Sequence, residues 1–524
     1  MTPSSPAKKD YLLRWFRKYH KWPALVFTFF IFLFSVSGIV LNHRGLFSSV
    51  DISRKYMPAI YRYNNWNLAA IKSQVNLADG NLLVYGNIGI WQTDSTYSSF
   101  IDFNQGFPSG TDNRKIYSVL QTSNNRLLAG TLFGLFEYKS GWHKVNLPVK
   151  EERIVKILKK GDSLLVMTRS NLLMANVNDP KLVFNKINIP AGEDYDNKAG
   201  LFKTLWVIHS GEIYGMAGRL LIDAVGLIFI FITLTGLFYW LAPHLLKRVK
   251  DSSKHSIKKA NKFSLKWHNR LGSWAIIVLL ITTLTGMFLR PPLLIPIAST
   301  KIAKIKFSEL DNPNPWFDRL RDVLYDKELK RFVVATSEGI YYSDDHLKTA
   351  LRKYPVQPPV SIMGITVLEQ LSKGEYLLGS FSGIFRWQPD QQIIQDYFTK
   401  LPADPSGGGG PPFGAMTVSG FIHQTSGDGM LFDYAGGAIS IGKGSFPGMS
   451  GNIVAKSPIS LWNTALEIHT GRIFEFMIGN FYILIVPVTG IAMLLILVAG
   501  FFSWYIPYRR KAKRIKVPAI NNPS

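Results

Sequence analysis

Residues 22–41 read WPALVFTFFIFLFSVSGIVL and contain no charged side chain. An uncharged apolar run of about 20 residues is the length that an α-helix needs to cross a hydrocarbon core roughly 30 Å thick. Three further apolar runs follow, at residues 220–241, 274–289 and 476–506. The sequence therefore predicts an integral membrane protein, an α-helical bundle in contact with the lipid bilayer. Its four predicted transmembrane helices are residues 22–44, 209–243, 267–290 and 469–507.

The positive charge of the chain is concentrated beside these apolar runs. Residues 1–22, 243–267 and 508–524 together carry +18 of the formal net charge of +25. This is the distribution of the positive-inside rule rather than that of a nucleic-acid-binding surface. We therefore expect a bacterial inner-membrane protein with both termini in the cytoplasm and no nucleic-acid partner. Its predicted cytoplasmic segments are residues 1–21, 244–266 and 508–524.

Cysteine is absent from the chain. Its absence excludes disulfides, thiolate-held iron–sulfur clusters and covalent attachment of c-type haem. Any metal must therefore be held by other side chains. We find no hydrolytic triad or pair of catalytic carboxylates, and we assign no catalytic residue.

The two long segments between the spans, residues 45–208 and 291–468, are rich in short strands and are expected in the periplasm. Both repeat a hydrophobic strand, a turn and a second strand, in most copies with a glycine in the turn and an aromatic residue near the end. The copies begin at residues 81, 126, 163, 331, 375 and 429. Spacings of mostly 37 to 54 residues are typical of propeller blades. We predict one six-bladed β-propeller split between the two insertions; two separate β-sandwiches are the alternative.

A second repeat lies in the predicted membrane segments. His20 precedes Ser37-Gly38 as His268 precedes Thr285-Gly286, and each glycine follows its histidine by 18 residues. These glycines would let a porphyrin or a neighbouring helix approach closely. The outer ends of the second and fourth spans also match, since residues 208–213 read IHSGEI and residues 468–473 read IHTGRI. The chain is thus a duplicated unit of helix, outer domain and helix.

The duplication places four histidines at related positions. A pseudo-twofold axis along the membrane normal would set His20 opposite His268 near the cytoplasm, and His209 opposite His469 near the outer surface. Two neutral imidazoles on facing helices are the ligands that a six-coordinate haem iron needs. A single interfacial histidine needs no cofactor to explain it, whereas four in repeat-related pairs favour two b-type haems.

Other polar residues near the outer surface are secondary candidates. His43 has no counterpart in the repeat and is either a second choice of haem ligand or a helix cap. Arg472 and Arg219 follow the outer histidines, where each could pair with a haem propionate or extend to the membrane surface. Asp223 could contact a cofactor or Arg219, or simply extend to the membrane surface. The glycine-rich residues 406–413 and the following 414–428 predict a mobile loop that could act as a substrate lid.

The histidine motifs resemble those of the PepSY-associated transmembrane family. The resemblance rests on Arg17-Lys-Tyr-His20-Lys-Trp22 leading to Ser37-Gly38, and on Leu466-Glu-Ile-His-Thr-Gly-Arg472. Members of this family include inner-membrane reductases of ferric siderophores and related iron chelates, which carry b-type haems between histidines. The resemblance implies the same role for His20, His209, His268 and His469. No PepSY module is recognised in the outer segments, which depart from the family in this respect.

These observations lead to one main hypothesis and one alternative. The main hypothesis is an oxidoreductase that carries electrons through two b-type haems to a periplasmic ferric siderophore or other iron chelate, for iron acquisition. The cytoplasmic segments are too short to fold a flavin or nicotinamide domain, so the donor would be quinol or a separate reductase. The alternative is a haem-free, membrane-anchored propeller that binds or senses a periplasmic ligand.

Overall fold

The computed structural model describes residues 6–361, 364–405, 414–423, 429–442 and 445–515. The chain divides into two compact units. The helical unit comprises Met1–Phe47, Asn197–Asp311 and Leu461–Ser524, and the β unit comprises Ser48–Asp196 and Asn312–Ser460. Most of the predicted lid, at residues 406–413 and 424–428, lies outside the described residues.

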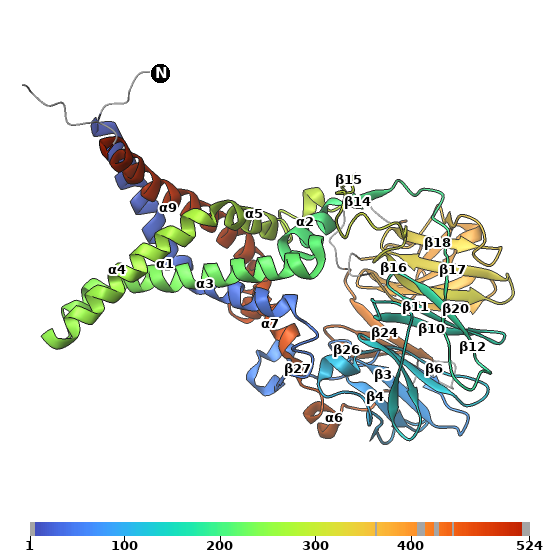
Figure 1. Ribbon diagram of the computed structural model, residues 1–524. Helices are drawn as coiled ribbons and strands as arrows, with labels where there is room; N and C mark the ends of the chain where they lie inside the picture. The colour runs from blue at the N-terminus through green and yellow to red at the C-terminus, as the bar shows by residue number, and fades with distance from the viewer. Residues whose placement is uncertain (1–5, 362–363, 406–413, 424–428, 443–444, 516–524) are drawn as a thin grey trace, which may run out of the picture. The chain divides into compact units, whose positions relative to one another are not determined.

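Long helices dominate the helical unit (Figure 1). They are α1 (Pro6–Asn42), α2 (Leu201–Ser210), α3 (Gly215–Leu246), α4 (Asp251–Trp274), α5 (Ile276–Met287), α7 (Leu461–His469), α8 (Glu475–Ile478) and α9 (Ile485–Ile515). Among the described residues, three helical stretches are long and apolar enough to cross a membrane, Tyr11–Asn42, Glu212–Leu246 and Arg472–Arg510. The count becomes four if α4 and α5 form one span.

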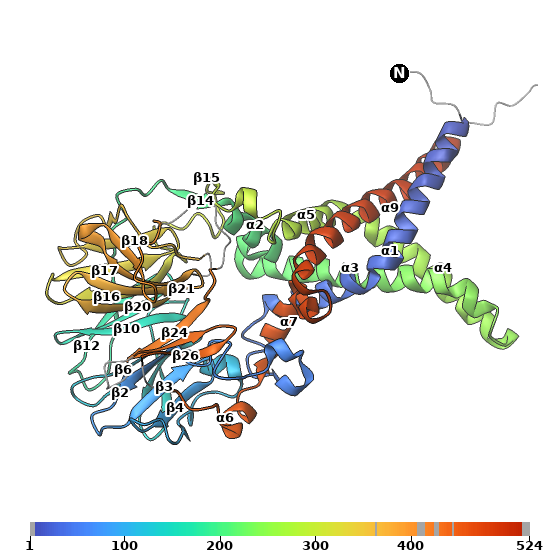
Figure 2. The ribbon, with the colours of Figure 1, turned by 180° about the vertical axis from the view of Figure 1, so that it is seen from behind.

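The helices pack through apolar side chains and expose others outward. Helices α1 and α9 run side by side, as Figures 1 and 2 show from opposite sides. The core of the bundle includes Ile31 of α1, Phe229 of α3 and Leu279 of α5, which are almost fully buried. Val26 and Ile277 are each 68% exposed, which places large apolar side chains where a soluble protein would have polar ones. This arrangement is that of a helical bundle in a lipid bilayer.

The third span differs from its prediction as a single helix over residues 267–290. A bend of 69° at Ala275 separates α4 from α5. Helix α4 begins at Asp251, so much of the expected basic loop at 244–266 is helical. That stretch contains no proline and no glycine before Gly272, and lysine, alanine and leucine favour a helix. The positive charge of this segment therefore did not exclude regular structure.

The first insertion forms three four-stranded antiparallel sheets. The first sheet contains β2 (Ser73–Asn76), β3 (Leu82–Gly86), β4 (Gly89–Thr93) and β5 (Ile101–Asp102). The second contains β6 (Ile116–Gln121), β7 (Leu127–Thr131), β8 (Gly134–Tyr138) and β9 (Trp142–Val145). The third contains β10 (Ile154–Lys160), β11 (Ser163–Thr168), β12 (Leu172–Asn176) and β13 (Asn185–Ile187).

The second insertion forms three more antiparallel sheets. The fourth sheet contains β16 (Leu320–Asp326), β17 (Arg331–Thr336), β18 (Gly339–Ser343) and β19 (Arg352–Lys353). The fifth contains β20 (Ile365–Ser372), β21 (Glu375–Ser380), β22 (Gly383–Gln388) and β23 (Ile393–Asp396). The sixth contains β24 (Val418–His423), β25 (Gly429–Asp433) and β26 (Gly437–Ile441). Two short pairs complete the strands, β1 (Asp51–Ile52) with β27 (Ile459–Ser460), and β14 (Lys198–Gly200) with β15 (Lys301–Ala303).

The six repeats recognised in the sequence are the second and third strands of the six sheets. Neighbouring sheets contact one another in chain order, and the sixth contacts the first through β24 and β2. The amide of Phe421 donates a hydrogen bond of 3.0 Å to the carbonyl of Lys72 at this last contact. The two insertions thus form one compact unit of small sheets rather than two separate domains.

The cores of the β unit lie between sheets rather than within them. The core that contains Val84 and Phe432 joins the first and sixth sheets, and the core that contains Met167 and Val334 joins the third and fourth. The other neighbouring sheets share cores in the same way. Each sheet buries its faces against its neighbours, so no sheet is stable alone.

Candidate functional site

Two pairs of histidine rings face each other in the helical unit. The ring centroids of His20 on α1 and His268 on α4 are 5.8 Å apart, with 72° between the ring planes. Those of His209 on α2 and His469 on α7 are 6.0 Å apart, with 51° between the planes. These are the two pairs expected from the repeat. The sequence spacing therefore predicted which histidines meet.

Each of the four imidazoles is held by a backbone carbonyl of another helix. The Nδ1 atoms of His20, His268 and His209 lie 2.9 Å from the carbonyl oxygens of residues 496, 232 and 282. His469 Nδ1 lies 3.0 Å from the carbonyl oxygen of residue 34. A carbonyl oxygen can only accept a hydrogen bond, so each Nδ1 carries the proton and donates it. Nε2 is then the nitrogen left with a lone pair for a metal.

A glycine lies four residues after each of these carbonyls and makes room for the ring. A Cβ atom on Gly286 would lie 2.6 Å from His209 Cε1, and one on Gly500 would lie 2.7 Å from His20 Nδ1. At Gly236 the distance to His268 Cε1 would be 3.0 Å, and at Gly38 the distance to His469 Cε1 would be 3.3 Å. At Gly38 and Gly286 the neighbouring helix that approaches closely does so with an imidazole ring.

A hydroxyl residue precedes three of the four glycines. Ser37 Oγ lies 3.0 Å from His469 Nδ1, and the Thr235 and Thr285 hydroxyls lie 3.4 Å from the Nδ1 atoms of their histidines. Each hydroxyl donates its own hydrogen bond to a carbonyl of its helix, at 2.7 or 2.8 Å. Its oxygen can therefore accept from the imidazole, as a second partner beside the carbonyl. Ala499 occupies the fourth position and offers no hydroxyl.

The two histidine pairs form separate layers along the bundle. Helix α1 contributes His20 to one layer and the carbonyl of Phe34 to the other. These residues are 14 positions apart, a rise of about 21 Å along an α-helix. At this separation one metal ion could not contact both layers.

The outer histidines owe their positions to glycines that end their helices. Gly211 follows His209 by two residues with φ +79°, and Gly471 follows His469 by two residues with φ +74°. Glycine adopts this left-handed conformation without the penalty of a Cβ atom. A Cβ atom on Gly211 would also lie 2.1 Å from the carbonyl oxygen of Gly218. The chain therefore turns directly after each outer histidine.

The geometry of the pairs fits an iron held between two imidazoles. With iron–nitrogen bonds of about 2 Å, the centroids of two opposed imidazoles lie about 6 Å apart. The observed spacings match this value, and all four rings have the required proton on Nδ1. Within the described ranges, no cluster of three or more histidines and carboxylates that could hold a metal ion is found. Each pair therefore has the side-chain type and spacing that an iron held between two imidazoles would need.

His43, the second choice of ligand, has a different partner. Its Nε2 lies 2.5 Å from Asp223 Oδ2, and Asn42 Nδ2 donates a hydrogen bond of 2.9 Å to Asp223 Oδ1. Asp223 is 9% exposed, so this pair satisfies a carboxylate that would be costly to bury alone. Arg219 pairs with Glu212 at 2.8 Å instead of Asp223. The contact between Asp223 and Arg219, one of the options expected from the sequence, is therefore not formed.

The arginines near the outer pair have carboxylate neighbours. Arg472 Nε lies 3.2 Å from Glu475 Oε2.

Arg290, which the sequence did not single out, lies close enough to His469 for its charge to act on the imidazole. Its Nε atom is buried and has no hydrogen-bond partner among the described residues. The signal available in the sequence was its place in the repeat, since it corresponds to Asn42, next to His43.

A family model describes the first half of this arrangement. The model of the PepSY-associated TM region matches residues 6–243. Residues 6–243 are a PepSY-associated TM region. The match includes His20, the carbonyl partners at residues 34 and 232, and His209. It confirms the family inferred from the histidine motifs and the membrane location of the chain. No curated protein matches this chain.

The solved structures that resemble this chain are distant. The extracellular domain of a protein described as a one-component system of B. thetaiotaomicron is 10% identical, with a TM-score of 0.35 over 74% of this chain and 34% of that one. A surface component of the type IX secretion system of Porphyromonas gingivalis is 8% identical, with a TM-score of 0.17 over 71% and 44%. The chain spans less than half of the length of these proteins. Such scores do not establish a shared fold.

Proposed function

We propose that this protein is a transmembrane b-type dihaem electron-transfer protein that reduces a periplasmic acceptor, a ferric siderophore or other iron chelate. One observation carries the proposal. Four imidazoles donate from Nδ1 to four backbone carbonyls, and their rings meet in two pairs at 5.8 and 6.0 Å. Histidines whose only role was to lie at the membrane interface would have no reason to carry the proton on Nδ1 in all four cases.

The residues of each layer have separate tasks. His20 and His268 would hold the inner haem, and His209 and His469 the outer one. The carbonyls set the proton and the plane of each ring, and the glycines allow each ring to lie against the neighbouring helix. Arg290, Arg472 and Arg219 are the cations available to the propionates of the outer haem. Bound between two imidazoles, haem iron accepts and passes on one electron at a time.

The direction of transfer follows from the proposed orientation. We place the basic segments beside the membrane in the cytoplasm by the positive-inside rule, and the β unit in the periplasm of a bacterial inner membrane. Electrons would enter at the inner pair from quinol or a separate reductase. They would leave from the outer pair. Reduction to ferrous iron weakens its hold on hard oxygen ligands and would release the metal for uptake.

The β unit would provide the binding surface for the acceptor. Its six sheets contact one another in cyclic order and share a core at each junction. We propose that they are the blades of a six-bladed β-propeller assembled from both insertions. Propellers bind ligands at the ends of a central channel, and such a channel would suit a chelate too large for a buried pocket.

A pyridine haemochrome assay and a reduced-minus-oxidised spectrum of the detergent-purified protein test the proposal. Two b-type haems per chain are expected. Oxidation of the reduced haems by a ferric chelate, with ferrous iron trapped by a coloured chelator, would then establish the acceptor reaction. A protein that folds and inserts without haem absorbance would overturn the proposal and favour the haem-free binding or sensor protein.

A further inference from the structure

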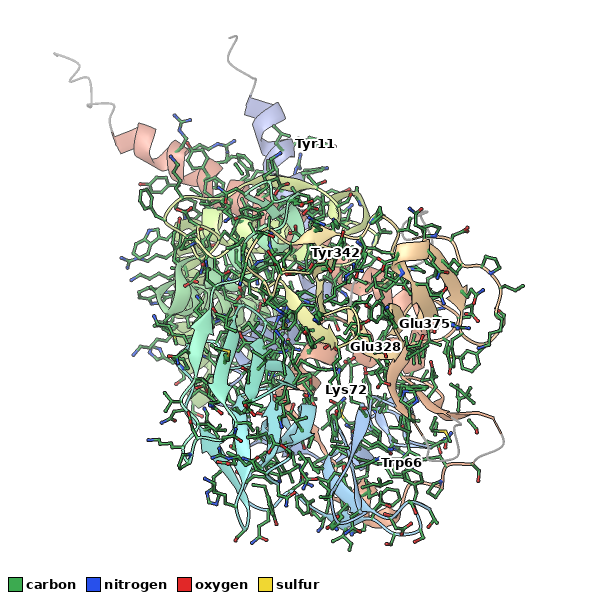
Figure 3. The ribbon with its side chains drawn as sticks, turned by 90° about the vertical axis from the view of Figure 1, so that its right-hand side faces the viewer. Tyr11, Trp66, Lys72, Glu328, Tyr342 and Glu375 are labelled. Carbon is green, nitrogen blue, oxygen red and sulfur yellow. The ribbon has the colours of Figure 1, made fainter. Side chains whose placement is uncertain are left out.

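Three cationic side chains of the β unit gather without ion-pair partners. Lys72 lies directly before β2, Arg153 directly before β10, and Arg321 within β16. Among the described residues, no carboxylate forms an ion pair with any of them. Figure 3 labels Lys72, which lies inward among the strands rather than on the rim of the unit. Lys72 Nζ donates a hydrogen bond of 3.1 Å to the carbonyl of Thr366.

The backbone brings two of these cations together at the junction of the third and fourth sheets. Strand pairing sets Ile154 opposite Thr168, so Arg153 and Arg169 flank the same end of the β10–β11 pair. The amide of Leu320 donates a hydrogen bond of 2.9 Å to the carbonyl of Arg169. Arg321 is therefore one residue from this contact. Two sheets from different insertions thus supply three arginines to one place.

Irregular pairing affects the strands that carry these residues. The register shifts between Leu320 and Asp322 in β16, and between Ile116 and Ser118 in β6. Arg321 and Tyr117 are the residues at the two shifts. The same shift recurs near the start of β10, β20 and β24, so it belongs to the repeated sheets; in β16 and β6 it re-aims the side chains of Arg321 and Tyr117. Arg153 lies over the ring of Tyr117 at 5.1 Å, which links the two positions.

The carboxylates of this region do not neutralise the cluster. Asp318 pairs with Arg169 at 2.7 Å, and Asp322 with Lys156 at 3.4 Å, so both already have a cation. Glu151 keeps one buried oxygen without a hydrogen bond, and burial raises the pKa of its carboxyl group. Even with Glu151 ionised, Lys72, Arg153 and Arg321 outnumber it, so the cluster keeps an excess of positive charge. Arg321 Nη1 donates only to the backbone carbonyls of Asp318 and Leu320, at 2.9 Å each.

The cations also destabilise one another. Burial lowers the pKa of Arg321 to about 10, and the charges of Arg169 and Arg153 act in the same direction against the attraction of Asp318 and Glu151. Burial lowers the pKa of Lys72 as well, against the attraction of Asp322. Like charges held together at partly buried positions cost free energy that a bound anion would recover. Arginine is the side chain best suited to carboxylate or phenolate oxygens because its N–H groups form a planar fork.

We propose that Lys72, Arg153 and Arg321, the cation cluster, form the binding site for a polyanionic oxygen-donor chelate of ferric iron. This proposal rests on the proposed function and specifies the acceptor as one with excess negative charge, such as a complex of polycarboxylate ligands. Because Arg153 belongs to the first insertion and Arg321 to the second, the site exists only when both insertions fold together. Neutral ferric trihydroxamates lack the charge that the cluster recognises.

Calorimetric titration of the full-length oxidised protein with ferric citrate tests the proposal. We compare wild-type protein with the Arg153→Gln/Arg321→Gln double variant, and with Arg352→Gln as a matched control. Arg352 is 61% exposed on β19 and outside the cluster. Loss of two charge-assisted hydrogen-bonding groups should weaken binding at least tenfold in the double variant. The Arg352→Gln variant should bind as the wild type does, and a neutral ferric trihydroxamate should bind more weakly than ferric citrate to wild-type protein.

Two measurements on the same samples, haem content and binding of ferric citrate, test the proposed function and the cation cluster independently. The haem content, read from the spectrum before titration, reports on the proposed function alone. Equal binding of ferric citrate by wild type and the double variant would overturn the cation cluster as the site, even with both haems present. Tight binding that the double variant loses would support it, even in protein without haem. If the double variant unfolds, Lys72→Gln provides the same comparison with a single change.

Discussion

Gly286 lies against the imidazole of His209 so closely that a Cβ atom on the glycine would come within 2.6 Å of Cε1. Glycine inside a helix costs roughly 0.5–1 kcal/mol relative to alanine, and α5 carries it in its last turn. The same relationship recurs at Gly38, Gly236 and Gly500. Space for an imidazole is therefore a property of all four helix surfaces that face a histidine.

We predict that Gly286→Ala reduces occupancy of the outer haem and leaves the inner haem unchanged. The new methyl group would displace a ring that a bound iron must hold in place. Gly38→Ala should have a smaller effect, because its Cβ would meet His469 Cε1 at 3.3 Å. Haem content and the reduced spectrum of the purified variants measure both. Gly272→Ala, where nothing lies within 4 Å, is the control. Equal haem loss in all three variants would contradict the role of Gly286 and Gly38 in making room for the histidine rings.

We predict that the histidine variants separate the two layers. His20→Ala or His268→Ala should remove the inner haem and retain the outer one, and His209→Ala or His469→Ala should do the reverse. The reason is that each pair belongs to one layer, about 21 Å from the other along α1. Haem content per chain measures the outcome. Full haem content in all four single variants would reject these residues as ligands.

We predict that His43→Ala retains both haems but destabilises the protein. The change leaves the buried Asp223 carboxylate with only Asn42 as a described partner, at a cost of about 1–3 kcal/mol. Chemical denaturation in detergent measures the loss. Arg219→Gln, which breaks the more exposed pair with Glu212, is the control and should cost about 1 kcal/mol or less. Loss of the outer haem in His43→Ala would instead identify His43 as a ligand.

We predict that an ion pair between the fifth and sixth sheets makes the stability of the β unit depend on pH. His423 Nε2 lies 2.7 Å from Glu369 Oε2 and joins β24 to β20. This hydrogen bond raises the pKa of His423 above 6.5. A raised folded-state pKa stabilises the protein below pH 6.5 and loses this contribution as the pH rises through the folded-state value. The effect should be small because His423 is 55% exposed.

Thermal unfolding of wild type and His423→Gln at pH 5.5 and pH 8.5 checks this prediction. Wild type should exceed the variant in melting temperature by more at pH 5.5 than at pH 8.5. Glu369→Gln should remove the same pH-dependent part, because it removes the partner charge. A difference between wild type and His423→Gln that is the same at both pH values would show that the pair contributes only packing.

The sequence predicted those elements of the fold that depend on residues close together in the chain. Apolar runs of helical length predicted the spans because a helix must cover a fixed thickness of hydrocarbon. The six repeats at residues 81, 126, 163, 331, 375 and 429 became the central hairpins of six sheets, because alternation and turn glycines act over a few residues. The bend at Ala275 was missed, since no proline or glycine stands at that position.

The sequence by itself determined three of the spans, the duplication and the pairing of His20 with His268 and of His209 with His469, because equal spacings in two copies imply a symmetry axis. Tertiary structure alone decided the carbonyl that orients each ring, the partner of His43, and the contact of Phe421 with Lys72 that joins the last sheet to the first. These contacts connect residues far apart in the chain. Their formation depends on how helices and sheets pack, so a local sequence pattern does not predict them.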